Sequence, residues 1–222
     1  EFVPPAFIWS GVAVNANGGR YGAGVPVEPR LTYGRMNTRG NVAWSIFDSD
    51  YETYIMQQQP ERYDRFTDGL DAVMEKWLGN GKLIKADTLD DLAKQLDIPA
   101  DTFKATVERY NSMAEAGEAV DFDVPAQWLA PVKTAPFYAP KHVCSTLTIP
   151  CGRHVNGDSR GLAAEDGPIP GLFAIGNVQG DFFGKDYPVH CPGVSHGRCV
   201  TFGQLVGEAC AKDTTIGELD FA

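Results

Sequence analysis

The sequence lacks the features typical of membrane, secreted and nucleic-acid-binding proteins. No segment approaches the run of about 20 apolar residues that a membrane-spanning helix requires. Residues 1–5 have neither the basic nor the apolar region of a signal peptide. Acidic residues outnumber basic ones, 29 to 19, and no basic cluster is present, which argues against a nucleic-acid partner. We expect a soluble, bacterial-type protein, and its compartment, cytoplasm or periplasm, stays open.

Cysteine is sparse as well, and its pattern excludes a disulfide framework. The five cysteines are an odd number and form no C-x-x-C pair. They are Cys144, Cys151, Cys191, Cys199 and Cys210. A zinc site requires closer, paired spacing, so we predict reduced, mostly buried thiols and no metal. A metal site built from the His190–Cys191 pair and the His196–Cys199 segment is the weaker alternative.

What is present is an ordinary globular composition, 43% hydrophobic and 22% charged, with segments of strand and of helix character. Short apolar runs at 11–14 and 44–47 predict strands. Apolar residues at helical spacing predict a helix over 60–78. Two short helices joined by a proline turn are predicted within 88–117. The middle of the chain is therefore expected to be helical.

The 88–117 segment has the signals of a helical hairpin. Thr88, three residues before Asp91, resembles a capping box at the start of the first helix. Asp101 or Thr102 is expected to cap the second helix, which ends at Gly117. Its buried stripe is predicted to be Phe103, Val107, Tyr110 and Met113.

Strand patterns return after this hairpin. They cover 142–149, 153–156 and 171–176, and a helix over 195–212 follows. The expected fold class is α+β, with a C-terminal strand–loop–helix unit of α/β type. Arg198, inside the final helix, is expected to make a salt bridge.

The run Ile169–Asn177 carries the most chemical information. An apolar strand ends in Gly176–Asn177, a glycine-rich loop follows, and a helix begins after Pro192–Gly193. Gly176 lets a ligand approach the backbone closely. The N–H groups at the start of the helix offer a site for a partly negative oxygen. A simple crossover from sheet to helix explains the same pattern equally well.

Several motifs, in the same order along nearly the whole chain, carry a family resemblance. Residues 169–207 read IPGLFAIGNVQGDFFGKDYPVHCPGVSHGRCVTFGQLVG, and residues 92–122 read LAKQLDIPADTFKATVERYNSMAEAGEAVDF. Shorter matches are PFYA at 136–139, GVAVN with GRY within 11–21, and WSIFD at 44–48. Together they resemble the FAD-dependent fumarate reductase/3-ketosteroid dehydrogenase flavoprotein family.

The resemblance implies FAD as the cofactor and a division into two domains. Residues 1–140 would form a substrate-capping domain, and residues 141–222 a C-terminal segment of the FAD-binding domain. The family also has a dinucleotide-binding G-x-G-x-x-G motif, which this sequence lacks. We therefore expect the C-terminal part of a longer flavoprotein, in which a region outside this sequence makes most contacts with FAD.

The resemblance also implies which residues contact the flavin. The expected FAD-binding residues are Gly176, Asn177, Gly193, Val194, Ser195 and His196. Gly176–Asn177 falls where the family has Gly-Glu, whose acid hydrogen-bonds the ribityl chain. Residues 193–195 fall where backbone N–H groups at a helix start meet the pyrimidine edge of the flavin. His196 is a further candidate at the same helix start.

The expected catalytic residues are Tyr187, His190 and Arg30. Tyr187 and His190 lie in the loop that the family has beside the flavin, and each carries a proton that it can donate. Arg30 is a candidate proton donor or anion clamp. The carboxylate-binding arginine of fumarate reductases aligns with His190, and their substrate histidine aligns near Thr148. These differences favour an enone, an aromatic acrylate or a steroid-like substrate over fumarate.

The resemblance implies an oxidoreductase that reduces or oxidises a C=C/CH–CH bond by hydride transfer with the flavin. Its partners would be a small-molecule substrate and the rest of the flavoprotein or an electron-donor domain. Two alternatives from other classes stay open. One is a capping-domain fragment without catalytic activity, and the other is a small-molecule binding module without its own FAD site.

Overall fold

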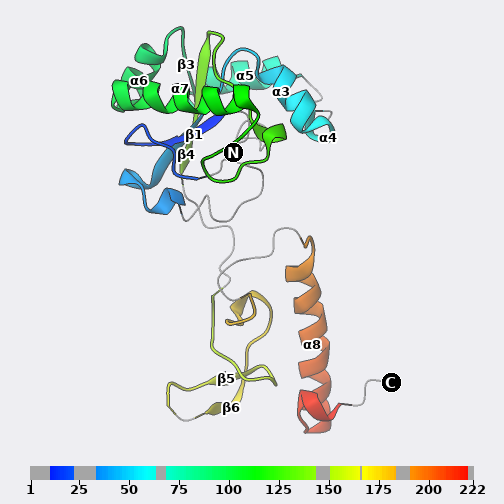
Figure 1. Ribbon diagram of the computed structural model, residues 1–222. Coiled ribbons are helices and arrows are strands. Elements are labelled where there is room, and N and C mark those ends of the chain that lie inside the picture. Colours follow the sequence, from blue (N-terminus) through cyan, green and yellow to red (C-terminus); the bar gives the residue numbers. More distant parts are fainter. Residues whose placement is uncertain are drawn as a thin grey trace. The chain divides into compact units, whose positions relative to one another are not determined.

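A computed structural model describes residues 11–22, 34–63, 69–143, 151–165, 167–183 and 191–219. The chain divides into two compact units, Glu1–Cys144 and Ser145–Ala222. Each unit contains both helices and strands (Figure 1), so the expected mixture of helix and sheet is confirmed. None of the helices in the described ranges is long and apolar enough to cross a bilayer.

The first unit is built on a four-stranded antiparallel sheet with the strand order β1-β2-β4-β3. The strands are β1 (Val12–Asn15), β2 (Val42–Ile46), β3 (Leu83–Ala86) and β4 (Phe137–Val143). The predicted strand over 142–149 begins earlier, at Phe137, because β4 pairs with both β2 and β3 and is central to the sheet. Residues 144–150 of that prediction lie outside the described residues.

Five helices of the described residues lie around this sheet. They are α3 (Tyr51–Gln58), α4 (Pro60–Tyr63), α5 (Leu70–Gly79), α6 (Leu89–Leu96) and α7 (Ala100–Ala116), with short 3₁₀ turns η1 (Arg39–Asn41) and η2 (Ala126–Trp128). The single helix predicted over 60–78 is wrong. Gly69 has a φ of 81°, which no α-helix accommodates, so α5 begins anew after it.

The helical hairpin follows its sequence signals except at one cap. Thr88 Oγ1 accepts a hydrogen bond from the backbone N–H of Asp91 at 3.0 Å, which confirms the first cap. The predicted caps Asp101 and Thr102 are wrong, because α7 already begins at residue 100 after Pro99. The first helix ends at Leu96 with Asp97 in the left-handed conformation, and Pro99 then precedes α7 without a side-chain cap.

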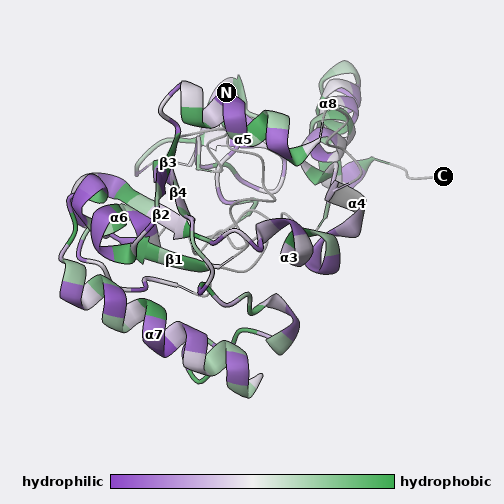
Figure 2. Cartoon of the chain, turned by 90° about the horizontal axis from the view of Figure 1, so that it is seen from above, coloured by the Kyte–Doolittle hydropathy of each residue, from purple (hydrophilic) through white to green (hydrophobic). Residues whose placement is uncertain are grey.

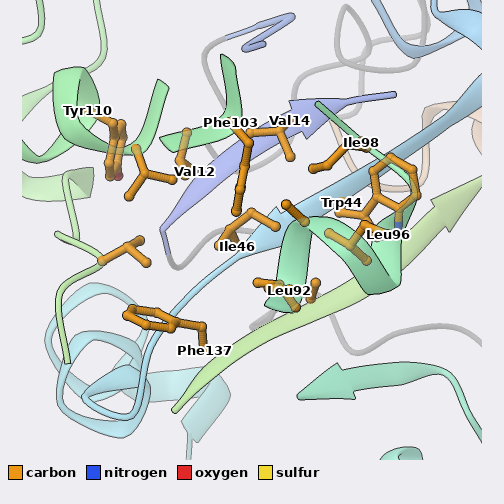
Figure 3. Close-up of a cluster of buried hydrophobic side chains, with 14 of the residues drawn as sticks. Val12, Val14, Trp44, Ile46, Leu92, Leu96, Ile98, Phe103, Tyr110 and Phe137 are labelled. Carbon is orange, nitrogen blue, oxygen red and sulfur yellow. The ribbon is translucent and has the colours of Figure 1, made fainter. Parts of the chain in front are cut away.

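The main core lies between one face of the sheet and the pair α6–α7. Figure 3 shows side chains from these helices and from β1 and β2 in this cluster. The predicted stripe Phe103, Val107, Tyr110 and Met113 of α7 is buried there, as expected. Figure 2 shows hydrophobic and hydrophilic residues along the same helix, which has one face in the core and one in water.

The opposite face of the sheet carries a second cluster. Neighbouring residues of a strand point to opposite faces, so Tyr138 of β4 leaves the main core that Phe137 and Ala139 enter. The ring of Tyr138 stacks on Phe47, with centroids 5.4 Å apart, and α3 and α5 cover both. The sheet is therefore enclosed between two layers of helices.

The second unit is smaller and contains a two-stranded antiparallel sheet and one long helix. Its elements are β5 (Arg160–Leu162), β6 (Pro168–Phe173), η3 (Gly176–Val178), α8 (Val194–Lys212) and η4 (Ile216–Glu218). The predicted strand over 171–176 is shifted toward the N-terminus, and the segment 153–156 forms only isolated bridges. The prediction of mostly buried cysteines is also wrong, since the four described cysteines are exposed.

A buried polar pair joins two strands of the first unit. Ser45 of β2 and His142 of β4 are both buried, and Ser45 Oγ lies 2.9 Å from His142 Nε2. Burial lowers the pKa of His142 to about 3, and the positive charge of Arg35 acts in the same direction. His142 therefore stays neutral in the folded chain throughout the physiological range.

We expect the first unit to lose stability as the pH falls below 6.5. The unfolded chain protonates His142 near pH 6.5 and the folded chain only near pH 3. Stability is complete above pH 6.5 and falls by about 1.4 kcal/mol per pH unit toward pH 3. Urea unfolding between pH 7 and 5, followed by tryptophan fluorescence, measures this loss, because all four tryptophans precede residue 129. A His142→Gln variant provides the control, and equal pH slopes in both chains would contradict the prediction.

Candidate functional site

The candidate site begins where β6 ends and the chain turns through η3. Gly176 is buried and has a φ of 65°, a left-handed conformation that favours glycine. A Cβ at this position would lie 2.8 Å from the Sγ of Cys199 on α8. The missing side chain therefore lets the η3 turn approach α8 closely.

A second backbone contact holds this turn from the other side. The N–H of Arg153 donates to the carbonyl of Val178 at 2.8 Å, and the N–H of Gly180 donates to the carbonyl of Arg153 at 2.9 Å. A Cβ on Gly152 would clash with the carbonyl oxygen of Val178. The turn is thus fixed between a neighbouring strand segment and α8.

The start of α8 supplies the other half of the site. Gly193, with a φ of 87°, precedes the helix, and no side chain caps the N-terminus. The first N–H groups of an α-helix have no acceptor within the helix and together carry a partial positive charge. Val194, Ser195 and the exposed His196 form this first turn. The N–H of Val194 donates to the carbonyl of Cys191 at 3.3 Å, so the N–H groups of Ser195 and His196 are the ones suited to an electron-rich ligand atom.

Two side chains of α8 connect the helix to the turn. The hydroxyl of Ser195 donates to Oδ1 of the exposed Asn177 at 2.9 Å. Arg198 donates through Nη2 to the carbonyl of Gly176 and, at 3.3 Å, to Oδ1 of Asn177. The structure therefore brings together Gly176, Asn177 and Ser195, which the sequence analysis singled out at two separate places.

Arg198 is a residue of this site that the sequence analysis misjudged. We expected a salt bridge, but its acceptors among the described residues are a carbonyl and an amide oxygen. The guanidinium is buried and lies 4.8 Å and 4.5 Å from the ring centroids of Phe182 and Phe183. Phe182 and Phe183 lie well before Arg198 in the sequence, and no local spacing rule links them to a residue inside the helix.

The three predicted catalytic residues, Tyr187, His190 and Arg30, lie outside the described residues. The weaker alternative, a metal site, includes His190, so this part of it also lies outside the described residues. Within the described ranges, no group of three or more His, Cys, Asp or Glu side chains is arranged to hold a metal ion.

Comparison with known proteins decides the family. The sequence profile of a family described as "FAD binding domain" matches residues 10–188. The chain belongs to this family. FAD is therefore its cofactor, and the predicted relation to fumarate reductase and ketosteroid dehydrogenase flavoproteins is confirmed.

Relatives of this chain are named after different substrates. The chain is 36% identical over 180 residues to a 3-oxosteroid 1-dehydrogenase of Mycolicibacterium smegmatis. This match covers 73% of this chain and 30% of the relative. It is 31% identical over 140 residues to a urocanate reductase of Eggerthella lenta, covering 63% of this chain and 22% of the relative. The chain thus spans less than a third of the length of these relatives.

A solved structure of the family has the same fold. The 3-ketosteroid delta1-dehydrogenase of Sterolibacterium denitrificans, in complex with 1,4-androstadiene-3,17-dione, matches with a TM-score of 0.74 and 27% sequence identity. The match covers 94% of this chain and 40% of that chain.

The described residues fit part of an FAD molecule. The exposed Asn177 amide next to an uncapped helix N-terminus is a donor set that suits a polyol and an electron-rich ring edge. Around Gly193, no atom of the described residues would lie within 4 Å of an added Cβ, so the approach to the helix start is open.

We expect Gly176→Ala to destabilise the second unit by about 2–4 kcal/mol, since alanine is strained at this φ and its Cβ meets Cys199. Far-UV circular dichroism follows both units during unfolding, whereas tryptophan fluorescence follows only the first, which contains every tryptophan. Adding Cys199→Ala is expected to recover the steric part of the loss but not the strain. A Gly176→Ala chain as stable as the original would show that η3 and α8 are not tightly packed.

Proposed function

We propose that this chain is the C-terminal part of a flavin-dependent oxidoreductase that acts on a C=C/CH–CH bond of a cyclic enone or ketone. The first unit corresponds to the substrate-capping domain, residues 1–140. The second corresponds to the returning strand–loop–helix of the FAD-binding domain, residues 141–222. The observation that supports this proposal most directly is the hydrogen bond from Ser195 to Asn177. It joins the turn after β6 to the start of α8, which no side chain caps.

The residues of the second unit bind and orient the flavin in this proposal. Asn177 hydrogen-bonds the ribityl chain, and the N–H groups of residues 193–195 bind the pyrimidine edge, where they favour negative charge. His196, exposed in the same helical turn, is a further contact. Bound FAD supplies hydride transfer to or from a substrate carbon. Most other FAD contacts come from a dinucleotide-binding region, whose G-x-G-x-x-G motif this sequence lacks.

The proton that accompanies the hydride is assigned to the loop before α8. Tyr187 and His190 each offer a proton-bearing side chain there, and Arg30 is the second candidate as proton donor or anion clamp. An imidazole has the suitable intrinsic pKa, whereas a tyrosine is suited to stabilising an enol. When the substrate is reduced, the electrons come from a separate donor domain or a free reductant. When it is oxidised, they pass from the substrate to the flavin and then to an external electron acceptor.

The substrate class follows from the charges that this chain lacks. Residue 190 is a histidine and residue 148 a threonine, where fumarate reductases have an arginine and a histidine for the substrate carboxylates. A buried carboxylate needs charged, paired donors. Relatives named for 3-oxosteroid and 4-oxocyclohexanecarboxylate dehydrogenation support a cyclic ketone or enone. A relative named urocanate reductase supports an aromatic acrylate as the alternative substrate class.

A non-catalytic role is the second candidate function. Its support is the missing dinucleotide-binding motif, which would leave a capping fragment or a small-molecule binding module. Full-length protein that includes the dinucleotide-binding region distinguishes the two candidates. Flavin absorption in that protein favours the oxidoreductase, whereas a colourless full-length protein that also fails to take up added FAD favours the alternative.

We expect the flavin-loaded protein to prefer enones or aromatic acrylates to fumarate. Losing a bidentate charged contact costs on the order of 2–5 kcal/mol, which is about 30-fold or more in kcat/KM. Steady-state reduction of fumarate, of an aromatic acrylate and of a 3-oxosteroid enone with a viologen donor compares the three classes. Fumarate turnover above that of both larger substrates would rule out this assignment.

Replacing the proton donor is expected to slow turnover with little effect on stability. Tyr187→Phe and His190→Gln each remove the acidic proton of one side chain, and loss of the true donor lowers kcat about 10²–10⁴-fold. Flavin content and melting temperature serve as controls for binding and folding. In a single-turnover measurement, substrate reoxidises the reduced flavin of each protein. If both variants retain flavin and their reoxidation rates stay within about threefold of the wild-type rate, the loop has a structural role only and Arg30 becomes the candidate.

A further inference from the structure

Arg198 has no role in the function proposed above, yet its setting is unusual. It lies in the second turn of α8 and is only 4% exposed, although it carries a full positive charge. Its hydrogen-bond acceptors, the carbonyl of Gly176 and Oδ1 of Asn177, are both neutral. Burying a charge is costly unless it is paired and hydrogen-bonded.

No carboxylate among the described residues neutralises Arg198. The ion pairs described in the second unit are His154–Asp181 and Lys212–Glu208, and neither includes it. Nε and Nη1 of Arg198 are buried without a hydrogen-bond partner in the described residues. The guanidinium is held instead by π-faces and dipoles, which stabilise a cation without cancelling its net charge.

The rings of Phe182 and Phe183 explain why the residue is an arginine. The guanidinium carbon lies 4.8 Å and 4.5 Å from the two ring centroids. A planar guanidinium stacks on aromatic faces and still directs N–H groups in its own plane, which a lysine ammonium does not. Arg198 therefore contacts both rings and the η3 turn with one side chain.

We propose that Arg198 is a positioning residue that places a positive charge, which no carboxylate of the described residues neutralises, behind the Asn177 turn and thereby favours the reduced, negatively charged flavin. This inference rests on the proposed function, because it assumes that the flavin binds at this turn. Asn177 is exposed and Arg198 is buried behind it, so a ligand on the turn experiences the charge without touching it. Solvent screens a buried charge weakly, and the N-terminus of α8 acts in the same direction.

Arg198 also determines which atom Asn177 presents. Oδ1 of Asn177 accepts one hydrogen bond from Ser195 and one from Arg198. Because both donors contact the same atom of the Asn177 amide, that atom is the oxygen. The amide nitrogen therefore points away from Ser195 and Arg198. The turn then presents N–H rather than an acceptor, which again suits a ligand that gains negative charge.

The test is the midpoint potential of the flavin-loaded protein, which reports the relative affinity for oxidised and reduced flavin. Arg198→Lys keeps the charge, Arg198→Gln keeps a hydrogen-bond donor without charge, and Arg198→Met keeps neither. Lys212→Met is the matched control, because it removes a positive charge from the far end of the same helix.

The Gln and Met variants are expected to bind reduced flavin about tenfold less tightly relative to oxidised flavin, a potential lowered by about 30 mV for a two-electron couple. Arg198→Lys and Lys212→Met are expected to stay within about threefold of wild type. Without flavin, amide exchange of residues 176–180 is expected to be about tenfold faster in Arg198→Met, because the guanidinium holds the Gly176 carbonyl.

Unchanged potentials in the Gln and Met variants overturn the inference. A shift in Lys and Met but not in Gln also overturns it, because that pattern reports hydrogen bonding and packing rather than charge. If Arg198→Met does not fold, the comparison of Lys with Gln decides alone. All potentials are measured on full-length protein that includes the dinucleotide-binding region. Full-length wild type that binds no flavin defeats the proposed function and this inference together, whereas flavin binding with equal potentials defeats only this inference.

Discussion

The close approach of the η3 turn to α8 is the contact on which the second unit depends. Gly176 permits it, because any side chain there would meet Cys199. Once the two backbones are this close, Ser195 and Arg198 reach the turn and fix Asn177. The position of each described site residue follows from this one steric constraint, since a displacement of the helix would separate all three hydrogen bonds at once.

The site thus formed is suited to negative charge, and no carboxylate in the described ranges pairs with its buried guanidinium. The helix N-terminus contributes a partial positive charge, and the buried guanidinium contributes a full one. Two aromatic rings keep the guanidinium away from water, which preserves its effect over distance. This electrostatic character suits a redox cofactor that gains electrons, and it agrees with the FAD-binding family to which the chain belongs.

The first unit is built around a sheet that has side chains packed against both of its faces. The alternation of side chains along β4 sends Phe137 and Ala139 to one helical layer and Tyr138 to the other. Its buried Ser45–His142 pair places two hydrogen-bonded polar groups inside the sheet, and burial keeps the histidine neutral at physiological pH.

Local signals in the sequence were enough for much of this architecture. The stripe of α7, the Thr88 cap, β1 and the final helix depend on residues within a few positions of one another, so periodicity and capping rules predict them. Local signals failed where partners are remote. β3 has only four residues, and β4 begins at Phe137 because it pairs with strands on both sides.

The sequence by itself determined the family, the cofactor and the two stretches that carry the described site residues. The tertiary structure alone decided that Asn177 and Ser195, 18 residues apart, share a hydrogen bond, and that Arg198 is buried against carbonyl oxygens and aromatic rings rather than paired with an acid. The physical reason is that a motif specifies residue types along a chain, whereas burial and hydrogen-bond partners depend on which backbone segments pack together.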